Sequence, residues 1–280
     1  MKTVSKIGPL RKILSLIRDR KRIGFVPTMG AFHEGHLSLM RRAKRECGWV
    51  VVSLFLNPTQ FGPNEDFNSY PRTLASDKKK AESAGVDLLW TPSAEEIYPP
   101  PYRTFVEVEA LGRRWEGASR PGHFRGVATV VAKLLQVVRP DRLYLGQKDY
   151  QQTLVIRQMI RDLHFDTAVR LIPTVREKDG LAMSSRNQRL APADRMAAPV
   201  LFRALEEARR LVSEGEQSGS KIVKRVGSVI RSEPRAAIDY AALCHPETLE
   251  PLDRLNDRAV LLLAVKIGGV RLIDNTLLQI

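Results

Sequence analysis

Two histidines mark the part of this sequence where residue types and spacing could support chemistry. His33 and His36 stand three positions apart with Gly35 between them, although the whole chain of 280 residues holds only five histidines. The apolar run "RIGFVPT" comes just before them, and "GHLSLMRRAK" follows with helical apolar spacing, so the pair occupies a strand-to-helix turn. In an open parallel sheet such a turn binds ligands, and the helix N-terminus attracts anions. Because imidazole N–H groups donate to phosphate oxygens, the turn is predicted to bind phosphate.

The histidine pair is also compatible with a purely structural role or with a metal site. Histidines at a helix start can serve the structure alone, as part of the helix cap. Zinc binds histidine as well, but H-x-x-H supplies too few ligands, and no cysteine or acidic residue stands at metal-ligand spacing. The glycines beside the pair, Gly30 and Gly35, favour a ligand because they let it approach the backbone closely.

The elements that must position this turn can be traced along the chain. Buried-strand patterns alternate with helix patterns over residues 22–175, which predicts βαβ units and a parallel sheet. The residues before position 23 predict a first helix. The predicted strands are "RIGFVPT", "WVVVSLFLN", "VDLLWTP", "RLYLG" and "AVRLIPTV". The predicted helices between them are "GHLSLMRRAKREC", closed by Gly48, "TLASDKKKAESAG", "FRGVATVVAKLLQVV" and "DYQQTLVIRQMIRDL".

The pattern changes after residue 190. Two helices, "ADRMAAPVLFRALEEARRLVSEG" and "SKIVKRVGSVIRSE", precede strands "AAIDYAAL", "AVLLLAVKI" and "VRLIDNTLL". Gly268 and Gly269 between the last two strands indicate a hairpin. We therefore expect an α/β parallel-sheet domain over residues 1–178, an inter-domain loop over 179–190 and a smaller α+β domain over 191–280.

The charge balance and cysteine content limit the class of protein. A net charge of +14 is spread over probable helix surfaces such as "DKKK" (77–80), and aromatic residues make up 6%, which favours a solvated surface over a nucleic-acid groove. No apolar run is long enough to span a membrane, and the N-terminus lacks the apolar core of a signal peptide. Cys47 and Cys244 form no disulfide framework, which predicts a reducing cytoplasm.

Several sequence blocks together resemble a known family. "PTMGAFHEGHLSL" is similar to the H-x-G-H element of adenylate-forming nucleotidyltransferases, and more narrowly to that of the pantothenate synthetase (pantoate–β-alanine ligase) family. The narrower resemblance rests on further blocks in the expected order: "SLFLNPTQFGPNEDFNSYPRT", "GHFRGVATVVAKL", "YLGQKDYQQ", "PTVREKDGLAMSSRNQRL" and "GGVRLIDN". One departure is Gln147, where the family commonly has Glu.

The resemblance implies a Rossmann-like first domain and a two-step reaction. The carboxylate of (R)-pantoate would attack the α-phosphorus of ATP, and the β-alanine amine would then attack the pantoyl adenylate to give pantothenate and AMP. It also implies a homodimer and a magnesium ion bound through the ATP phosphates, for which we name no protein ligand. No nucleic-acid or membrane partner is expected.

The resemblance assigns roles to individual residues. His33, His36, Lys148 and Arg186 would be catalytic, with His36 assisting departure of pyrophosphate. Gln60 and Gln152 would bind pantoate, and Gln60 would also contact β-alanine. The ATP-binding residues would be Met29, Gly30, His33, Gly35, His36, Gly146, Lys148, Asp149, Val175, Met183, Ser184, Ser185 and Arg186.

The chemistry of several of these residue types fits those roles. Lys148 follows a predicted strand and offers a mobile positive charge to phosphate, while Asp149 can accept from a ribose hydroxyl. The hydroxyls of Ser184 and Ser185 and the guanidinium of Arg186 are good donors to a triphosphate. Taken alone, "GQKD" is better explained as an ordinary helix start and "MSSRN" as an ordinary polar linker, so the functional interpretation depends on the other blocks.

Two competing functions remain on the sequence alone. A nucleotidyltransferase could use the same ATP-binding turn with another acceptor, such as a phosphorylated alcohol, although "NPTQF" and "GQKDYQQ" argue against it through the resemblance. A basic nucleic-acid-binding protein with a disabled nucleotide site should carry a basic stripe with interleaved aromatic residues. The sequence has no such stripe.

Overall fold

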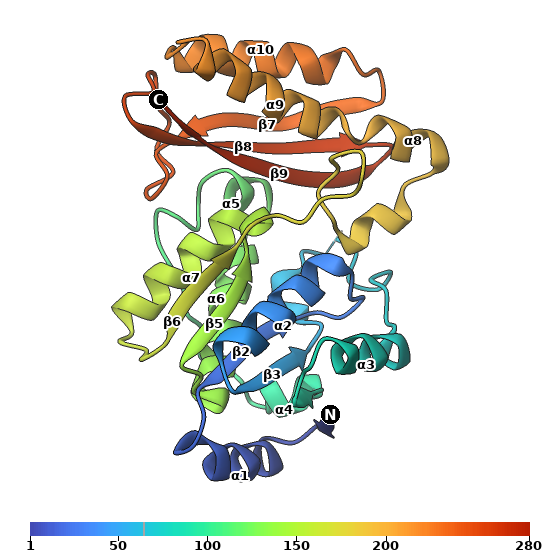
Figure 1. The fold of residues 1–280 in the computed structure, drawn as a ribbon, viewed down its shortest axis with the longest axis vertical. Helices are drawn as coiled ribbons and strands as arrows, with labels where there is room; N and C mark the ends of the chain where they lie inside the picture. The colour runs from blue at the N-terminus through green and yellow to red at the C-terminus, as the bar shows by residue number, and fades with distance from the viewer. Residues whose placement is uncertain (64) are drawn as a thin grey trace. The chain divides into compact units, whose positions relative to one another are not determined.

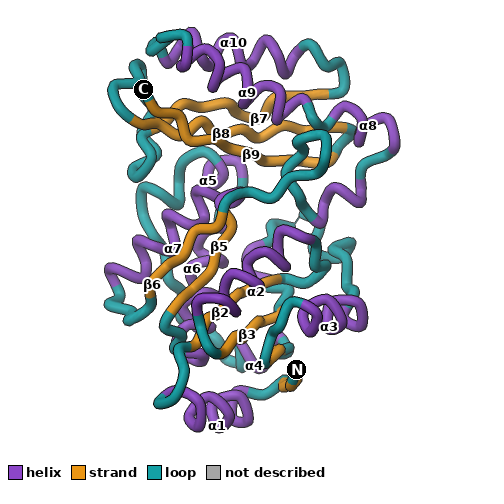
Figure 2. Tube along the Cα trace, in the orientation of Figure 1, coloured by secondary structure: helices purple, strands orange, loops and turns teal. Residues whose placement is uncertain are grey.

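The computed structural model describes residues 1–63 and 65–280. The chain forms two compact units, and each is described by itself. Unit 1 comprises Met1–Arg113, Arg120–Gln147 and Gln152–Pro173. Unit 2 comprises Arg114–Ser119, Lys148–Gln151 and Thr174–Ile280. Figure 1 traces both along the chain, and Figure 2 separates their helices, strands and loops.

Unit 1 is built on a parallel sheet of six strands in the order β1-β4-β3-β2-β5-β6. The strands are β1 (Lys2–Val4), β2 (Ile23–Thr28), β3 (Trp49–Leu54), β4 (Leu88–Trp90), β5 (Arg142–Gly146) and β6 (Ala168–Ile172). The chain runs outward from β2 to β4, then returns to the other side of β2 with β5. The switch point of the sheet therefore lies between the carboxyl ends of β2 and β5, where ligands bind in open α/β sheets.

Helices cover both faces of this sheet. One face packs against α1 (Ile7–Arg18), α6 (His123–Val138) and α7 (Tyr150–Asp162), and the other against α2 (Glu34–Glu46) and α3 (Leu74–Ser83). Successive strand residues serve opposite faces: Phe25 belongs to the first core and Val26 to the second. This double burial explains why the strands read as continuous apolar runs. Short helices in the loops of unit 1 are η1 (Pro58–Gln60) and α4 (Ala94–Ile97). Helix α5 (Glu116–Ser119) belongs to unit 2, and η2 (Gln147–Asp149) begins in unit 1 and ends in unit 2.

Unit 2 is a three-stranded antiparallel sheet with helices on one face (Figure 1). Its strands are β7 (Ala236–Cys244), β8 (Arg258–Ile267) and β9 (Val270–Gln279), and its helices are η3 (Ser185–Arg189), α8 (Pro192–Ala197), α9 (Val200–Ser213) and α10 (Gly219–Arg231). Gly268 and Gly269 form the predicted two-residue turn, with φ of 52° and 84°. The expected fold class, a parallel α/β sheet with a smaller α+β unit, is confirmed.

Several local predictions differ from the structure. Residues 2–4 form an edge strand instead of the start of a helix. The helix expected from residue 193 onward is two helices, because Pro199 interrupts the pattern between α8 and α9. Helix α2 ends at Cys47 in extended conformation, so Gly48 is no left-handed cap. The predicted solvated face 77–80 of α3 is wrong at Asp77, which is fully buried.

Among the described residues, no helix is both long enough and apolar enough to cross a membrane.

Candidate active site

The two histidines cap the helix that follows β2. His33 is the N-cap residue of α2, and its Nδ1 accepts a hydrogen bond from the backbone N–H of Gly35 at 3.2 Å. His36 Nδ1 accepts from the N–H of His33 at 3.3 Å, and the two ring centroids lie 4.1 Å apart. Because both Nδ1 atoms act as acceptors, each neutral ring carries its proton on Nε2. The turn therefore offers two Nε2–H donors beside the switch point of the sheet.

The segment between β2 and the histidines has an unusual backbone. Gly30 has φ of 93°, and Ala31, which has a Cβ atom, has φ of 52°. Left-handed backbone suits Gly30 but is unfavourable for alanine. Phe32 is buried, and its ring lies 5.6 Å from that of His36. Residues 30–32, which lead to the histidines, therefore combine a left-handed backbone with a buried aromatic side chain that packs beside His36.

A buried amide pair lies next to this segment in unit 1. The Gln60 side chain, in η1, is buried, and its Nε2 donates to Met29 Sδ at 3.1 Å. Asn57 Nδ2 donates to Gln60 Oε1 at 3.1 Å and to the carbonyl of Gly126 at 3.2 Å. Burial raises the pKa of Tyr98 to about 12, so its hydroxyl stays protonated and donates to Asn57 Oδ1 at 2.7 Å. These bonds hold Gln60 in one orientation, as a selective polar contact requires.

Helix α6 approaches η1 closely because Gly126 has no side chain. A Cβ atom at this position would stand 2.2 Å from the carbonyl oxygen of Thr59 and 2.7 Å from Gln60 Cα, both backbone atoms. We expect Gly126→Ala to lower the free energy of unfolding by about 1–3 kcal/mol, since overpacking forces backbone shifts. The same shift should raise KM for pantoate, the substrate that the sequence resemblance assigns to Gln60. Steady-state kinetics and chemical denaturation will measure both effects.

Gly8→Ala is the matched control, because no atom lies within 4 Å of a Cβ built at this helical glycine. Unchanged KM and unfolding free energy in Gly126→Ala would show that η1 tolerates displacement and would contradict the expectation.

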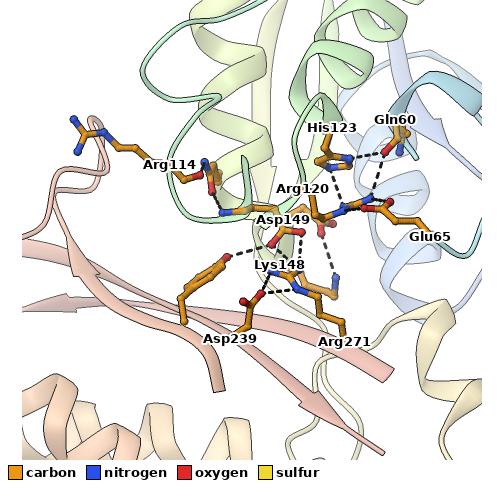
Figure 3. A network of polar contacts seen from close by, with 12 residues as sticks. Gln60, Glu65, Arg114, Arg120, His123, Lys148, Asp149, Asp239 and Arg271 are labelled. Atoms are coloured by element: carbon orange, nitrogen blue, oxygen red, sulfur yellow. Dashed lines mark hydrogen bonds and ion pairs between the residues drawn. The ribbon is translucent and has the colours of Figure 1, made fainter. Parts of the chain in front are cut away.

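Arg120 and His123 form a second polar cluster around the backbone of Gln60 (Figure 3). His123 Nδ1 lies 2.8 Å from the carbonyl oxygen of Gln60, and Arg120 donates to the same oxygen at 3.3 Å. Arg120 also pairs with Glu65 through bonds of 2.7 and 2.5 Å. Burial alone would raise the pKa of Glu65, but the hydrogen bond and charge of Arg120 outweigh it and keep the pKa below that of an ordinary glutamate. Sequence reasoning assigned no role to Arg120, since only its tertiary contacts reveal one.

In unit 2, Lys148 and Asp149 lie in η2, and the Lys148 Nζ donates to Asp149 Oδ1 at 3.2 Å. The backbone carbonyl of Lys148 accepts from Asn275 Nδ2 of β9 at 2.9 Å. Strand β9 therefore fixes the backbone that carries the lysine.

The segment from Val175 to Met183 folds back on itself as a short hairpin. Met183 N–H donates to the carbonyl of Val175 at 3.0 Å, and Arg176 bridges to Ala182 in antiparallel register. Gly180, with φ of 89°, makes the turn and leaves room for Phe202, which a Cβ atom would overlap at 2.0 Å. This 175–183 hairpin leads directly into the Ser184–Arg186 segment.

Arg176 anchors the 175–183 hairpin to β9. Its guanidinium donates to the two oxygens of Asp274 at 2.6 and 3.0 Å, and it also donates to the carbonyl of Gly180 at 3.0 Å. The Asp274 side chain is only 2% exposed. Immediately after the hairpin, Ser184 Oγ caps η3 by accepting from the N–H of Arg186 at 3.3 Å.

The structure gathers the predicted site residues into two groups. Unit 1 holds Met29, Gly30, His33, Gly35, His36 and Gln60 around the end of β2, with Gly146 at the end of β5 and Gln152 on α7. Unit 2 holds Lys148, Asp149, Val175, Met183, Ser184, Ser185 and Arg186. No group of three or more metal-ligating side chains occurs among residues 1–63 and 65–280.

A parallel sheet with donor-rich turns at its switch point is typical of nucleotide-binding α/β enzymes. A model of the family described as pantoate–beta-alanine ligase matches residues 2–277. The chain belongs to this family, and its activity is the ATP-dependent formation of an amide C–N bond between pantoate and β-alanine.

Individual relatives are similar over nearly the whole chain. The pantothenate synthetase of Pelotomaculum thermopropionicum is 53% identical over 279 residues, which cover 99% of each chain. A crystal structure of pantothenate synthetase from Thermus thermophilus superposes with a TM-score of 0.95 at 49% identity and 99% coverage of each chain. A pantoate–beta-alanine ligase from Francisella tularensis, crystallised with beta-gamma ATP and beta-alanine, has a TM-score of 0.82 at 38% identity, with 99% of this chain and 97% of that chain covered.

Proposed function

We propose that the predicted site residues perform the ligase reaction with the roles that the sequence resemblance assigns. The reaction passes through pantoyl adenylate and releases pyrophosphate and AMP. The observation that carries the proposal is the histidine turn, where both Nδ1 atoms accept backbone N–H groups, so that each neutral ring has its N–H at Nε2. Donors fixed before the reaction stabilise charge that develops on a phosphoryl group without reorganisation.

In the first step, a pantoate carboxylate oxygen forms a bond to the α-phosphorus of ATP as the bond to pyrophosphate breaks. His36 Nε2–H donates to the departing pyrophosphate, with His33 beside it, and Lys148 and Arg186 neutralise charge on the phosphates. Met29, Gly30, Gly35 and Gly146 offer backbone to the nucleotide, and Asp149 accepts from its ribose. Val175, Met183, Ser184 and Ser185 complete the ATP ligands.

In the second step, the β-alanine amine attacks the acyl carbon, a C–N bond forms and AMP leaves with the C–O bond electrons. Gln60 and Gln152 hold the hydroxyls and carboxylate of pantoate, and Gln60 also contacts β-alanine. The bonds from Asn57 and to Met29 support this role because they fix the Gln60 amide. No protein nucleophile is required, so the residues act by alignment and charge neutralisation.

Magnesium is proposed as the partner of the ATP phosphates. The side chains assigned to the phosphates are imidazole, ammonium, guanidinium and hydroxyl groups, which suit phosphate oxygens rather than a hard cation. Mg²⁺ typically keeps several waters and uses few protein ligands. This donor set fits an ion that arrives bound to ATP, so we assign no protein ligand to it.

Three further proposals follow from the resemblance. Residues 179–190 form a phosphate-binding loop between domains 1–178 and 191–280, and two chains form a homodimer. The protein works in the cytoplasm, which the two buried free cysteines support, because a reducing compartment keeps thiols unpaired.

The test is ATP–pyrophosphate exchange with and without pantoate, followed by AMP release on addition of β-alanine. Exchange that depends on pantoate, with AMP turnover that rises with β-alanine, is the expected result. A folded, magnesium-supplied sample without pantoate-dependent exchange would overturn the adenylate step as proposed. The matched substrate control replaces pantoate by a phosphorylated alcohol, which should support no exchange.

A further inference from the structure

A buried carboxylate that has no assigned role in the site contacts the backbone of residues 31 and 32 in unit 1. Asp77, in the first turn of α3, has no exposed surface. Its Oδ2 accepts the backbone N–H of Ala31 at 2.9 Å, and its Oδ1 accepts that of Phe32 at 2.8 Å. Both partners lie more than forty positions earlier in the chain. A charge at complete burial is costly unless it is well bonded, so this one requires an explanation.

Two further contacts from α3 complete the attachment. Thr73 Oγ1 donates to Asp77 Oδ2 at 3.1 Å, which orients the carboxylate. Lys80 Nζ donates to the carbonyl oxygen of Phe32 at 2.6 Å. Helix α3 therefore binds the N–H of Ala31 through Asp77 and both polar backbone groups of Phe32 through Asp77 and Lys80.

These contacts end one residue before the histidine turn. Ala31 has φ of 52°, a conformation that an alanine does not keep unless its surroundings impose it. The carboxylate of Asp77 holds this conformation by binding two successive N–H groups, one on each oxygen. The next residue is His33, whose own N–H is the donor to His36 Nδ1. A fixed Phe32 thus fixes the donor that decides which nitrogen of His36 carries the proton.

We propose that Asp77 is a positioning residue of the ligase, which holds the 30–32 backbone so that His33 and His36 present Nε2–H to the ATP phosphates. The inference rests on the proposed roles of the two histidines. It assigns a task to a residue whose charged sequence neighbourhood, "DKKK", predicts only a solvated surface. Lys80 assists Asp77 through the carbonyl of Phe32.

The experiment compares Asp77→Asn with the matched variant Asp87→Asn. Asp87 also accepts a backbone N–H, from Val50 at 2.8 Å, and pairs with Lys44, but it lies at the amino ends of β3 and β4. In Asp77→Asn the side-chain oxygen still accepts one of the two backbone N–H groups. The side-chain NH₂ group faces the other N–H, so two donors meet and that hydrogen bond is lost. Both variants lose hydrogen bonding of the same kind, and only the first touches the histidine turn.

We expect Asp77→Asn to lower the rate of pyrophosphate exchange at saturating substrates by about 10- to 100-fold, as misplacement of catalytic groups does. KM for pantoate should change far less than the rate. The imidazole ¹⁵N signals of His33 and His36, assigned with single histidine variants, should shift away from the Nε2–H tautomer. Asp87→Asn should lose thermal stability while its exchange rate and histidine signals stay as in the wild type.

Lys80→Met provides a milder variant in case Asp77→Asn does not fold. It should lower the exchange rate less and move the same two histidine signals. Wild-type histidine signals and exchange rate in either folded variant would overturn the proposal, as would an effect on stability alone that matches Asp87→Asn. Failure of the proposed function is seen separately, as a wild-type exchange rate when His36 itself is replaced.

Discussion

Replacing His36 by asparagine is expected to lower the rate of pantoate-dependent pyrophosphate exchange by about 10²–10³-fold, the usual cost of removing one fixed transition-state donor. The asparagine oxygen can take the place of Nδ1 and still accept the N–H of His33, so α2 keeps its cap. The side chain is too short to place a donor where Nε2 stands. The variant therefore removes the donor and keeps the fold, and KM for ATP should change less than the rate.

Two variants make the measurement decisive. His36→Gln reaches the Nε2 position with an amide N–H and should retain more activity than His36→Asn. His245→Asn is the matched control, because His245 Nδ1 also accepts backbone N–H groups, from Glu247 and Thr248, at 3.2 and 3.3 Å. Equal rates of pyrophosphate exchange in wild type and His36→Asn would show that His36 takes no part in the mechanism.

Replacing Asp274 by alanine is expected to lower the free energy of unfolding by about 3–5 kcal/mol, because it leaves the Arg176 guanidinium without its buried partner. The Asp274 side chain is 2% exposed and that of Arg176 is 19% exposed, so little water is available to replace the lost bonds. The N–H of Asn275 also loses its acceptor, Asp274 Oδ1. Since Arg176 anchors the 175–183 hairpin, KM for ATP should rise as well. Urea denaturation and hydrogen exchange of β9 will measure the first effect.

Asp257→Ala is the control for this second prediction. The Asp257 side chain is 75% exposed, and its Oδ2 lies 3.6 Å from Arg258 Nε, so the two side chains form a surface ion pair. Such pairs contribute about 0–1 kcal/mol. A loss in Asp274→Ala no larger than that of Asp257→Ala would show that the hairpin is held by other contacts, such as Arg176 over the Phe202 ring at 4.8 Å.

The central strands of unit 1, β2 to β5, were predictable because they are buried on both faces, whereas the helices beside them are buried on one. "RIGFVPT" and "RLYLG" read as apolar runs between amphipathic helices, and such patterns identify βαβ units without knowledge of the fold. Residues 2–4 carry no such signal, since "KTV" is too short for any period and mostly exposed. Pro199 was visible in the sequence, but the apolar spacing on both sides of it suggested one helix.

The sequence showed which residues of the site stand at strand ends, but it did not show the contacts that hold them. His33 and His36 follow a strand and precede a helix, so local pattern alone located them. The supports of the site come from distant parts of the chain: Asp77 for Phe32, Arg120 for Gln60, and Asn275 for Lys148. Nothing in a run such as "DKKK" distinguishes the one carboxylate that turns inward, because its partners are set by tertiary structure.

The capping contacts of His33 and His36 also bear on how this enzyme can change by mutation. Many catalytic groups are held at a cost to stability, so replacing them yields inactive but more stable proteins. Here the same imidazoles bind the first N–H groups of α2, and loss of an N-cap typically costs about 0.5–2 kcal/mol. Most substitutions of either histidine therefore forfeit stability and activity at once, and the usual trade-off between the two does not operate at this turn.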